Sequence, residues 1–423
     1  MTLDEPVSNL LVIFDLDGTL FETGSSVVPA VNDSLRDIGM ETMDSHEILF
    51  LLGERTPVFC EKVVGGRGDE YEEFRERLWH YENKYIGEKG RLFDGTEEML
   101  VDLKDKGFEL AVCSNGSQEY IDYVMETTGI GGYFDEKVSA SKMESKEDAI
   151  IGLIEKYEKE KAVMVGDKVH DFSATEDVGI PSIGVSYGYG YEEELDDADF
   201  VADSPAQIVG YVLKVEIFGR VEDEIGDTPW VIGINGVDNS GKTVFSRDLE
   251  KYLRSRVYDT QLVELDDFHN KKEKRREGDD EIQAYWDNAF DLDRLEQGVL
   301  KPIKEEGVLD VELELLDLES DEYSVDKRYK VGQNTVVILE GTLLFREPID
   351  NYIDHRIFLD IDFSTVLDRA KLRDEGRFDE DVIERYKRKY IPIQKKYFEE
   401  CEPREKADLV IDNNDFKEPK LMN

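Results

Sequence analysis

The stretch VIFDLDGTLF, residues 12–21, is an apolar run that ends on Asp15 and Asp17, with a Gly-Thr turn directly behind. The apolar residues 10–15 predict a buried strand. In open parallel sheets ligands bind at the carboxyl ends of the strands, so both acids stand where chemistry is expected. Two carboxylates this close repel unless a cation or a proton lies between them, which indicates Mg²⁺. An acid pair that only caps a turn is the alternative.

Strand-like and helix-like segments alternate through the first half of the chain. The predicted strands are 10–15, 108–114, 161–167 and 180–186, and the predicted helices are 96–107, 117–129, 145–157 and 204–224. This alternation predicts a parallel sheet with helices on both faces. Helical patterns also fill the stretch between the first two strands, most clearly over 69–85. We therefore expect an inserted helical cap at about 22–90.

The pattern starts again after residues 225–229, which we take as the boundary between domains 1–224 and 225–423. The second domain is predicted to contain strands 230–236, 259–266, 335–341 and 354–361, a hairpin at 308–331 and two closing helices. A chain of 423 residues exceeds the usual size of one hydrophobic core. The fold class expected is therefore α/β with two domains.

The composition is strongly acidic, with 99 Asp and Glu against 52 Lys and Arg and a formal net charge of −47. The acids are spread over both halves, which argues against a local interaction tail. We interpret this surface as adapted to high salt, where self-repulsion is screened, although an acidic mesophilic protein is the alternative. Such a surface repels nucleic acid.

The remaining global features favour a reduced, cytoplasmic protein. There are three cysteines, Cys60, Cys113 and Cys401, without a CxxC pair or a cluster at zinc-ligand spacing. No apolar stretch approaches membrane-spanning length, and the N-terminus lacks a basic-then-apolar signal. We expect no membrane partner, and oligomeric state is not indicated.

Further polar residues follow the later strands of the first half. Ser114 ends strand 108–114 and is suited to hold a phosphate oxygen, while Asp167 and Asp171 follow strand 161–167 and would complete a Mg²⁺ site. Lys146 stands just inside a helix start, where a cation opposes the helix dipole and so suggests a functional reason. Lys142, in the loop before it, is the competing phosphate-binding lysine.

These motifs resemble the haloacid dehalogenase-like phosphatases, and in particular the phosphoglycolate phosphatase-like branch. DLDGT (15–19), SNG (114–116), Lys146 in SKEDAI and GDKVHD (166–171) match the family's motifs in order. The resemblance implies that Asp15 is the nucleophile, which forms an aspartyl-phosphate, and that Asp17 is the general acid and base. It also implies that Ser114 and Lys146 hold the phosphoryl oxygens. Asp15, the backbone carbonyl of Asp17 and Asp167 would bind Mg²⁺, with Asp171 in support.

A second chemical site opens the second domain. GINGVDNSGKTVF (233–245) follows a predicted strand, opens a predicted helix and satisfies G-x-x-x-x-G-K-[ST]. Backbone amides of such a loop cradle phosphates, the lysine reaches the β/γ oxygens and the threonine binds Mg²⁺. A chance glycine-rich turn is the alternative. The predicted nucleotide-binding residues are Gly236, Asn239, Ser240, Gly241, Lys242 and Thr243.

Acids and arginines that a kinase needs follow in the sequence. Asp266 ends strand 259–266 and is the candidate base, and Glu340 ends another strand as a second acid near the metal. Three arginines are spaced four residues apart: Arg369, Arg373 and Arg377. On a helix their guanidinium groups would lie on one face, where they could bind phosphate oxygens, and the alternative is that they pair with neighbouring acids. The basic residues of 271–276 either clamp an anionic acceptor or form a solvated loop.

From about 229 to 415 the chain resembles the uridine kinase-like branch of P-loop kinases. DDFH (266–269), EGTLLF (340–345) and the arginine helix carry the likeness. It implies phosphorylation of a small hydroxyl compound by ATP, with Asp266 as base, Thr243 and Glu340 at Mg²⁺, and the arginines in a lid over the phosphates. LDDFH differs from the Asp-Ser-Phe-Tyr of nucleoside kinases, so uridine itself is not indicated.

The sequence therefore predicts a bifunctional enzyme that removes a phosphate from a small ester and adds one to a small hydroxyl metabolite, such as a nucleoside or sugar derivative. A polynucleotide end-healing enzyme is an alternative, against which the cap and the net charge of −47 argue. A further alternative is an enzyme with one activity whose other half is a ligand-binding regulatory module.

Overall fold

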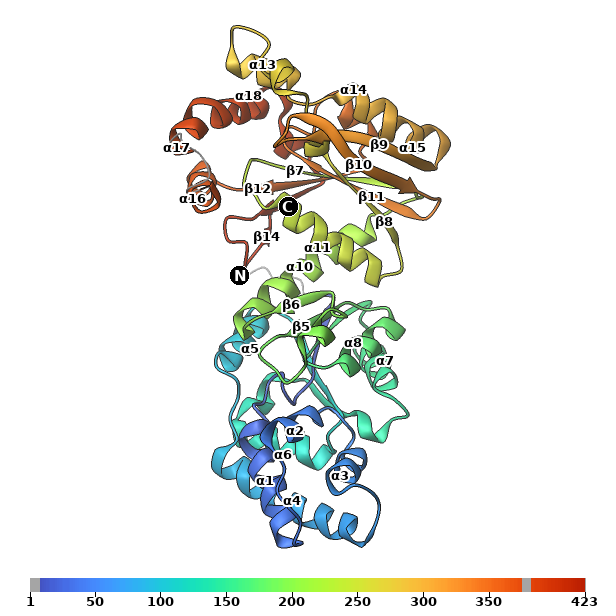
Figure 1. The fold of residues 1–423 in the computed structure, drawn as a ribbon, viewed down its shortest axis with the longest axis vertical. Coiled ribbons are helices and arrows are strands. Elements are labelled where there is room, and N and C mark those ends of the chain that lie inside the picture. Colours follow the sequence, from blue (N-terminus) through green and yellow to red (C-terminus); the bar gives the residue numbers. More distant parts are fainter. Residues whose placement is uncertain (1–7, 375–381, 423) are drawn as a thin grey trace, which may run out of the picture. The chain divides into compact units, whose positions relative to one another are not determined.

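The computed structural model describes residues 8–374 and 382–422 and divides into two compact units, Met1–Glu216 and Ile217–Asn423. Each unit is an α/β fold built on a sheet of six strands within the described residues (Figure 1). The predicted fold class is confirmed. The division falls inside helix α10 (Pro205–Asp223), ahead of the predicted boundary after residue 224.

The first unit has an all-parallel sheet with the strand order β3-β2-β1-β4-β5-β6. Its strands are β1 (Leu10–Phe14), β2 (Glu109–Ser114), β3 (Glu136–Ser139), β4 (Lys161–Gly166), β5 (Ser182–Val185) and β6 (Phe200–Ala202). The helices that follow are α5 (Thr96–Asp105), α6 (Gln118–Thr128), α7 (Lys146–Tyr157), α8 (Val169–Val178) and α9 (Glu192–Leu195). Helices α7 and α8 pack on one face of the sheet, and α5 lies on the other side (Figure 1).

Strand β1 lies in the interior of the sheet, and every one of its residues is buried. Its uninterrupted apolar run is typical of a strand that is covered on both faces. It pairs with β2 on one side and β4 on the other. Strands β3 and β6 were not predicted. They are four and three residues long, too short for a periodic pattern to stand out.

Four helices are inserted after β1 and pack around an apolar core of their own: α1 (Gly24–Asp37), α2 (Ser45–Phe50), α3 (Thr56–Val64) and α4 (Asp69–Lys89). Helices α1 and α4 pack against each other, and Phe74 is fully buried between them and their neighbours. A separate core allows this insertion to hold its shape as a cap on the unit.

The second unit has the strand order β14-β13-β12-β7-β11-β8, parallel except for β14. Its strands are β7 (Trp230–Gly236), β8 (Asp259–Glu264), β11 (Thr335–Gly341), β12 (His355–Asp360), β13 (Leu409–Asp412) and β14 (Lys420–Leu421). A separate antiparallel hairpin is formed by β9 (Leu309–Asp317) and β10 (Glu322–Val331). Its helices are α11 (Lys242–Ser255), α12 (Lys272–Arg275), α13 (Glu281–Asn288), α14 (Leu292–Leu295), α15 (Lys301–Glu306), α16 (Phe363–Asp374), α17 (Val382–Arg385), α18 (Ile391–Cys401) and α19 (Pro403–Lys406).

The prediction that two helices close the second unit is wrong, because β13 and β14 follow the last helix. Strand β13 has only three apolar residues in a row, and its pairing with β12 is what holds it in the sheet. That pairing partner lies some fifty residues earlier in the chain, so no local pattern indicates it.

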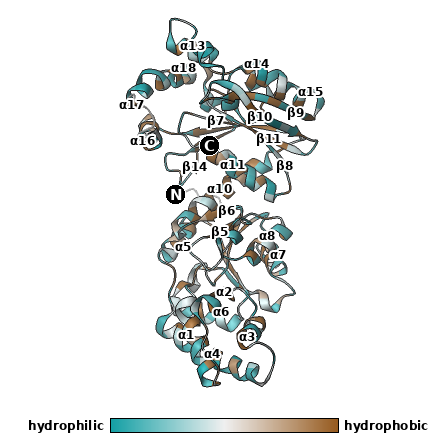
Figure 2. Ribbon diagram, viewed as in Figure 1, coloured by the Kyte–Doolittle hydropathy of each residue, from teal (hydrophilic) through white to brown (hydrophobic). Residues whose placement is uncertain are grey.

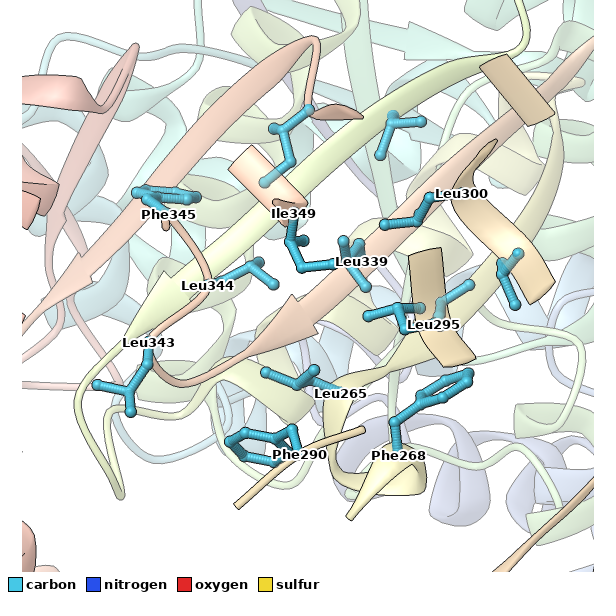
Figure 3. Close-up of a cluster of buried hydrophobic side chains, with 14 of the residues drawn as sticks. Leu265, Phe268, Phe290, Leu295, Leu300, Leu339, Leu343, Leu344, Phe345 and Ile349 are labelled. Atoms are coloured by element: carbon cyan, nitrogen blue, oxygen red, sulfur yellow. The ribbon is translucent and has the colours of Figure 1, made fainter. Parts of the chain in front are cut away.

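Apolar side chains fill both units. The central strands of the two six-stranded sheets are rich in hydrophobic residues, while the outer helices carry many hydrophilic ones (Figure 2). In the second unit, the side chains of Leu265, Leu339 and Leu344 meet in the main core cluster with the aromatic rings of Phe268 and Phe290 (Figure 3). No described helix combines the length and the apolar character needed to cross a bilayer.

Candidate functional site

The acids of the first unit gather at one edge of its sheet. Asp15 follows β1, and Asp167 follows the neighbouring strand β4, whose register pairs Phe14 with Val165. Asp171 lies in the first turn of α8. Carboxylate oxygens of Asp15, Asp167 and Asp171 lie within 4.8 Å of one another, and all three residues are buried.

This group fits a hard cation such as Mg²⁺. Carboxylate oxygens are the ligands that Mg²⁺ prefers. The Oδ1 atom of Asp167 is buried and accepts no hydrogen bond among the described residues, whereas its Oδ2 atom accepts one from the amide of Tyr189 at 2.7 Å. A buried carboxylate oxygen without a partner is costly, and a bound cation would satisfy it.

The electrostatics of the three acids agree with such a cation. Burial, and to a lesser extent neighbouring acids, raise the pKa of Asp15 well above its usual value, although Lys146 opposes the shift. Burial and the charge of Asp171 raise the pKa of Asp167 to about 7. Three carboxylates share one lysine at this site, and the positive charge of a bound cation would lower these pKa values.

Lys146 brings its ammonium group to Asp15. Its Nζ atom donates to Asp15 Oδ1 at 2.8 Å and also to Asp171 Oδ1. Burial alone would lower the pKa of Lys146, but the charges of Asp15 and Asp171 outweigh it and raise the pKa. Lys142 is exposed in the turn before α7. Of the two competing lysines, Lys146 is the one in contact with the acids.

Asp17 lies outside this cluster of three acids, and its carboxylate accepts hydrogen bonds from two hydroxyls. Tyr120 donates to Asp17 Oδ1 at 2.5 Å, and Thr23 donates to the same oxygen at 2.7 Å. Burial raises the pKa of Asp17, and these hydrogen bonds counteract it. Neither Tyr120 nor Thr23 was predicted, because no motif marks them. The one available signal is that both lie within a few residues of segments that were singled out.

Ser114, at the end of β2, is buried beside this site, and its hydroxyl accepts from the amide of Gly116 at 3.1 Å. Between them, Asn115 reaches the cap, where its side-chain amide donates to the carbonyl of Gly53 at 2.8 Å. The SNG turn thus links this edge of the sheet to the inserted helices.

The cap and the sheet edge enclose a cavity of about 460 Å³ that contains Asp15, Asp17, Ser114 and Lys146. The cap contributes apolar and charged side chains to its wall, among them Leu52, Arg55, Phe59, Arg75, Leu78, Trp79 and Glu82. A cavity of this size suits a small ligand, and Asp15 within it is largely shielded from bulk solvent.

In the second unit the glycine-rich loop connects β7 to α11, as the motif requires. Asn239 and Gly241 have φ angles of 60° and 93°, the left-handed conformation that turns amides toward a common point. Gly236 has no room for a side chain, since a Cβ atom would lie 2.7 Å from the carbonyl oxygen of Leu359. Ser240 is buried, and its carbonyl accepts from Asn413 at 2.7 Å.

The lysine and threonine of the loop lie next to the predicted acids. Lys242 donates to the carbonyl of Val237 at 3.0 Å, and Thr243 donates to Glu340 Oε1 at 2.9 Å. Burial raises the pKa of Glu340, an effect that Lys242 opposes and Asp266 reinforces. Lys242, Asp266 and Glu340 are thus close enough to influence one another, as a phosphate and Mg²⁺ site requires.

The two neighbouring acids of LDDFH have different surroundings. Asp267 accepts from Lys327 Nζ at 2.5 Å and from the hydroxyl of Tyr329 at 3.0 Å, which fixes it against the hairpin. The side chain of Asp266 is 71% exposed and available to an acceptor. His269 packs its ring on Phe290 at 4.5 Å between centroids.

The arginine helix α16 lies against the loop. Arg369 donates to the carbonyl of Asn239 at 3.0 Å and to that of Asn413 at 2.7 Å. Arg373 donates to the hydroxyl of Tyr386 at 3.0 Å. Arg377 lies outside the described residues.

Two further features of the second unit concern residues whose role the sequence left open or did not indicate. Within the basic stretch, Lys271 pairs with Glu322 and Arg275 with Asp321, both on the hairpin. Asp238, inside the phosphate-binding loop, was not singled out. Burial raises its pKa, opposed by Lys242 and reinforced by Asp266, so a third acid lies at this site.

Known proteins resemble the two halves separately. Residues 12–185 match the family of haloacid dehalogenase-like hydrolases, and residues 231–417 match the phosphoribulokinase/uridine kinase family. A phosphoglycolate phosphatase of Agrobacterium fabrum is 30% identical over 48% of this chain and 94% of its own length. Another, from Colwellia psychrerythraea, is 29% identical over 44% of this chain and 88% of its own. A solved structure described as a possible uridine kinase from Bacillus stearothermophilus is 22% identical, with a TM-score of 0.39, and covers 47% of this chain and 96% of its own.

Proposed function

The chain belongs to the haloacid dehalogenase-like hydrolases through its first half and to the phosphoribulokinase/uridine kinase family through its second, and we propose that both halves are active enzymes. The first hydrolyses a small phosphate monoester. The second transfers the γ-phosphoryl group of ATP to a hydroxyl of a small metabolite. The two activities act on different positions of one metabolite or on successive metabolites, because opposite reactions at the same oxygen would only consume ATP.

In the hydrolase, a carboxylate oxygen of Asp15 attacks the phosphorus atom while the bond from phosphorus to the leaving oxygen breaks. Asp17 gives its proton to that oxygen, and an aspartyl-phosphate remains on Asp15. Asp17, now ionised, takes a proton from a water molecule that attacks the phosphorus atom, and phosphate leaves. Lys146 and Ser114 hold the phosphoryl oxygens, supported by the 2.8 Å contact between Lys146 and Asp15.

Asp15, the backbone carbonyl of Asp17 and Asp167 would hold Mg²⁺, with Asp171 in support. Mg²⁺ supplies positive charge that offsets the negative charge of the phosphoryl oxygens. The unpartnered Oδ1 atom of Asp167 supports this assignment.

In the kinase, Asp266 takes the proton of the acceptor hydroxyl as that oxygen attacks the γ-phosphorus of ATP, and ADP leaves. The loop of Gly236, Asn239, Ser240 and Gly241 holds the phosphates through its amides, and Lys242 neutralises their charge. Thr243 and Glu340 would hold Mg²⁺. Arg369 and Arg373 support the loop from α16.

The observation that carries the proposal is that each half brings a nucleophile or base, a lysine and a set of acids to one sheet edge. In the first unit Asp15 clusters with Asp167 and Asp171 and contacts Lys146. In the second the charges of Lys242 and Asp266 both act on the carboxyl group of Glu340. A regulatory half would need only the phosphate-binding groups.

The test is a screen of small phosphate esters and hydroxyl metabolites with the intact protein and two variants. Asp15→Asn is expected to abolish hydrolysis and to spare phosphorylation, and Lys242→Ala to do the reverse. Loss of both activities from either change would show that the two sites depend on each other. Turnover in only one assay would reduce the proposal to a single enzyme with a binding half.

We also propose that the enzyme works at high salt and in the cytoplasm. The net charge of −47 supports the first point, since salt screens such repulsion. The need for ATP supports the second.

A further inference from the structure

The segment 186–191, which connects β5 to α9, lies against the acid cluster of the hydrolase. Two glycines allow this approach, since a Cβ atom on Gly188 would lie 2.4 Å from Asp167 Cβ and one on Gly190 would lie 1.9 Å from the carbonyl oxygen of Asp167. The amide of Tyr189 donates to Asp167 Oδ2 at 2.7 Å. The backbone of the segment therefore orients this carboxylate, whose Oδ1 atom has no hydrogen-bond partner among the described residues.

The same segment is also held by Lys168, the residue that follows Asp167. The ammonium group of Lys168 donates to the carbonyl of Tyr189 at 2.9 Å, and the side chain is 7% exposed. The amide and the carbonyl of Tyr189 are thus bonded to two consecutive residues of the turn after β4. A displacement of Tyr189 would consequently disturb the position of Asp167.

The side chain of Tyr189 reaches the start of the cap. Its hydroxyl accepts a hydrogen bond from the amide of Gly24 at 2.7 Å, and Gly24 is the first residue of α1. Amides in the first turn of a helix have no partner within the helix, so the hydroxyl of Tyr189 supplies one. The first residue of the cap is therefore tied to the segment that orients Asp167.

The chain that leaves the cap meets the same segment. The amide of Glu22 donates to the carbonyl of Arg91 at 2.9 Å, so the two connections between cap and sheet lie side by side. The ring of Phe93 lies 4.9 Å from the ring of Tyr187 and 6.3 Å from that of Tyr189, between centroids. Both connections of the cap thus contact the segment 186–191.

From these contacts we infer that Tyr189 is a positioning residue that couples the Mg²⁺ site of the hydrolase to the attachment of its cap. The backbone of Tyr189 orients Asp167 toward the cation, and its hydroxyl holds the first residue of α1. Coupling between two sites is reciprocal, so a bound cation makes the contact with Gly24 more persistent, and loss of that contact weakens cation binding. The inference rests on the proposed metal site and names the residue through which the cap depends on it.

Amide hydrogen exchange of Gly24, followed by NMR, tests the coupling without relying on turnover. In the intact protein, saturating Mg²⁺ is expected to slow the exchange of this amide by at least about threefold. In Tyr189→Phe the exchange should be faster and independent of Mg²⁺, because the acceptor is gone. The amide of Met43, which donates to Asn32 Oδ1 at 2.8 Å within the cap, is the internal control and should exchange equally with and without Mg²⁺.

Calorimetric titration with Mg²⁺ measures the reciprocal effect. The binding that Asp167→Asn removes is assigned to the hydrolase site. Tyr189→Phe keeps the ring and the backbone contacts and is expected to weaken that binding by at least about threefold, the size of effect that loss of one hydrogen bond gives. Tyr191→Phe removes the hydroxyl of a residue on the same segment that is 51% exposed, and it should bind Mg²⁺ as the intact protein does.

Equal Mg²⁺ affinity of Tyr189→Phe and the intact protein would overturn the inference, and so would exchange of Gly24 that does not respond to Mg²⁺ in the intact protein. If Tyr189→Phe does not fold, Gly24→Ala replaces it, because the added Cβ atom would lie 3.0 Å from the hydroxyl oxygen of Tyr189. Weaker Mg²⁺ binding is expected there too, and unchanged binding overturns the inference.

The same titration separates the failure of this inference from the failure of the proposed metal site. If Asp167→Asn removes no Mg²⁺ binding, the metal site is refuted and the inference with it. If Asp167→Asn abolishes binding that Tyr189→Phe leaves unchanged, the coupling role of Tyr189 alone is refuted.

Discussion

Asp167 is held in place by glycines that leave no room for a side chain. A Cβ atom on Gly18 would lie 2.1 Å from Asp167 Oδ2, and one on Gly190 would lie 1.9 Å from the carbonyl oxygen of Asp167. Atoms cannot approach this closely, so a larger residue at either position must displace the acid. The geometry of the proposed metal site therefore depends on residues that contribute no ligand atom.

We predict that Gly18→Ala weakens Mg²⁺ binding by at least about tenfold, a loss of about 1.4 kcal/mol. Gly39→Ala is the matched control, because Gly39 has nearly the same φ angle, 76° against 77°, but nothing within 4 Å of the added Cβ. Both substitutions carry the same backbone strain of about 1 kcal/mol, so their difference isolates the clash with Asp167. The measurement is the Mg²⁺ concentration that gives half-maximal hydrolysis. Equal values for the two variants would contradict the prediction.

The hydroxyl group of Tyr120 influences the pKa of Asp17. Its hydroxyl hydrogen bond stabilises the ionised carboxylate and so lowers the pKa of Asp17, against the rise that burial causes. In Tyr120→Phe the pKa of Asp17 should rise further. Since Asp17 enters the first step of the proposed mechanism in its protonated form, the alkaline limb of the kcat/KM profile for hydrolysis should move to higher pH by about one unit.

The control for this change is Tyr123→Phe, one turn along the same helix. It removes a hydroxyl that donates to the carbonyl of Asn83, away from Asp17. Its pH profile should coincide with that of the intact protein. A shift to lower pH in Tyr120→Phe would show that the hydroxyl does not stabilise the ionised form.

Helix α16 holds the glycine-rich loop in place through hydrogen bonds from Arg369. The guanidinium group of Arg369 joins two segments far apart in the sequence, the loop at Asn239 and the end of β13 at Asn413. A lysine at this position has the charge but not the planar fork, so it cannot satisfy both carbonyls. The loop would then lose part of its preorganised shape.

We therefore expect Arg369→Lys to raise the KM for ATP by about tenfold with a smaller effect on kcat, because one unsatisfied carbonyl costs about 1–3 kcal/mol. Hydrolysis by the first unit should be unaffected. Lys371→Ala removes a charge from an exposed position of the same helix and should leave the KM unchanged. Steady-state kinetics with varied ATP checks both, and an unchanged KM in Arg369→Lys would refute the bracing role.

The net charge of the whole chain affects its stability at low salt. A net charge of −47 spread over both units destabilises the compact state through self-repulsion at low salt. Because the screening length falls from about 10 Å at 0.1 M to about 3 Å at 1 M salt, stability should rise with ionic strength.

We predict that raising KCl from about 0.1 M to about 2 M increases the Tm of both unfolding transitions by about 5 °C or more. Differential scanning calorimetry resolves the transitions. KCl is preferable to a sulfate salt, which would strengthen hydrophobic burial in any protein. A Tm that does not change with KCl would exclude adaptation to high salt.

Local patterns in the sequence were sufficient to predict most of the fold. Strand β1 and helices α5, α6, α7 and α10 were predicted within a few residues of their ends, because burial of one helix face or of a whole strand leaves a regular spacing in the sequence. The short strands β3, β6, β13 and β14 were not predicted. They are strands because neighbours offer them hydrogen bonds, and that information is absent from their own residues.

The proposed reacting groups divide in the same way. Spacing and position at strand ends led to the prediction of Asp15, Asp167, Lys242 and Glu340, because ligands bind at the carboxyl ends of parallel strands and phosphates at a glycine-rich loop before a helix. Only the tertiary structure decided which of two adjacent acids is available, since Asp267 is bound by the hairpin and Asp266 is not. It also brought Tyr120 to Asp17 and Glu82 to the cavity wall. Side chains from separate helices come together through packing of distant segments, whose register no short stretch of sequence contains.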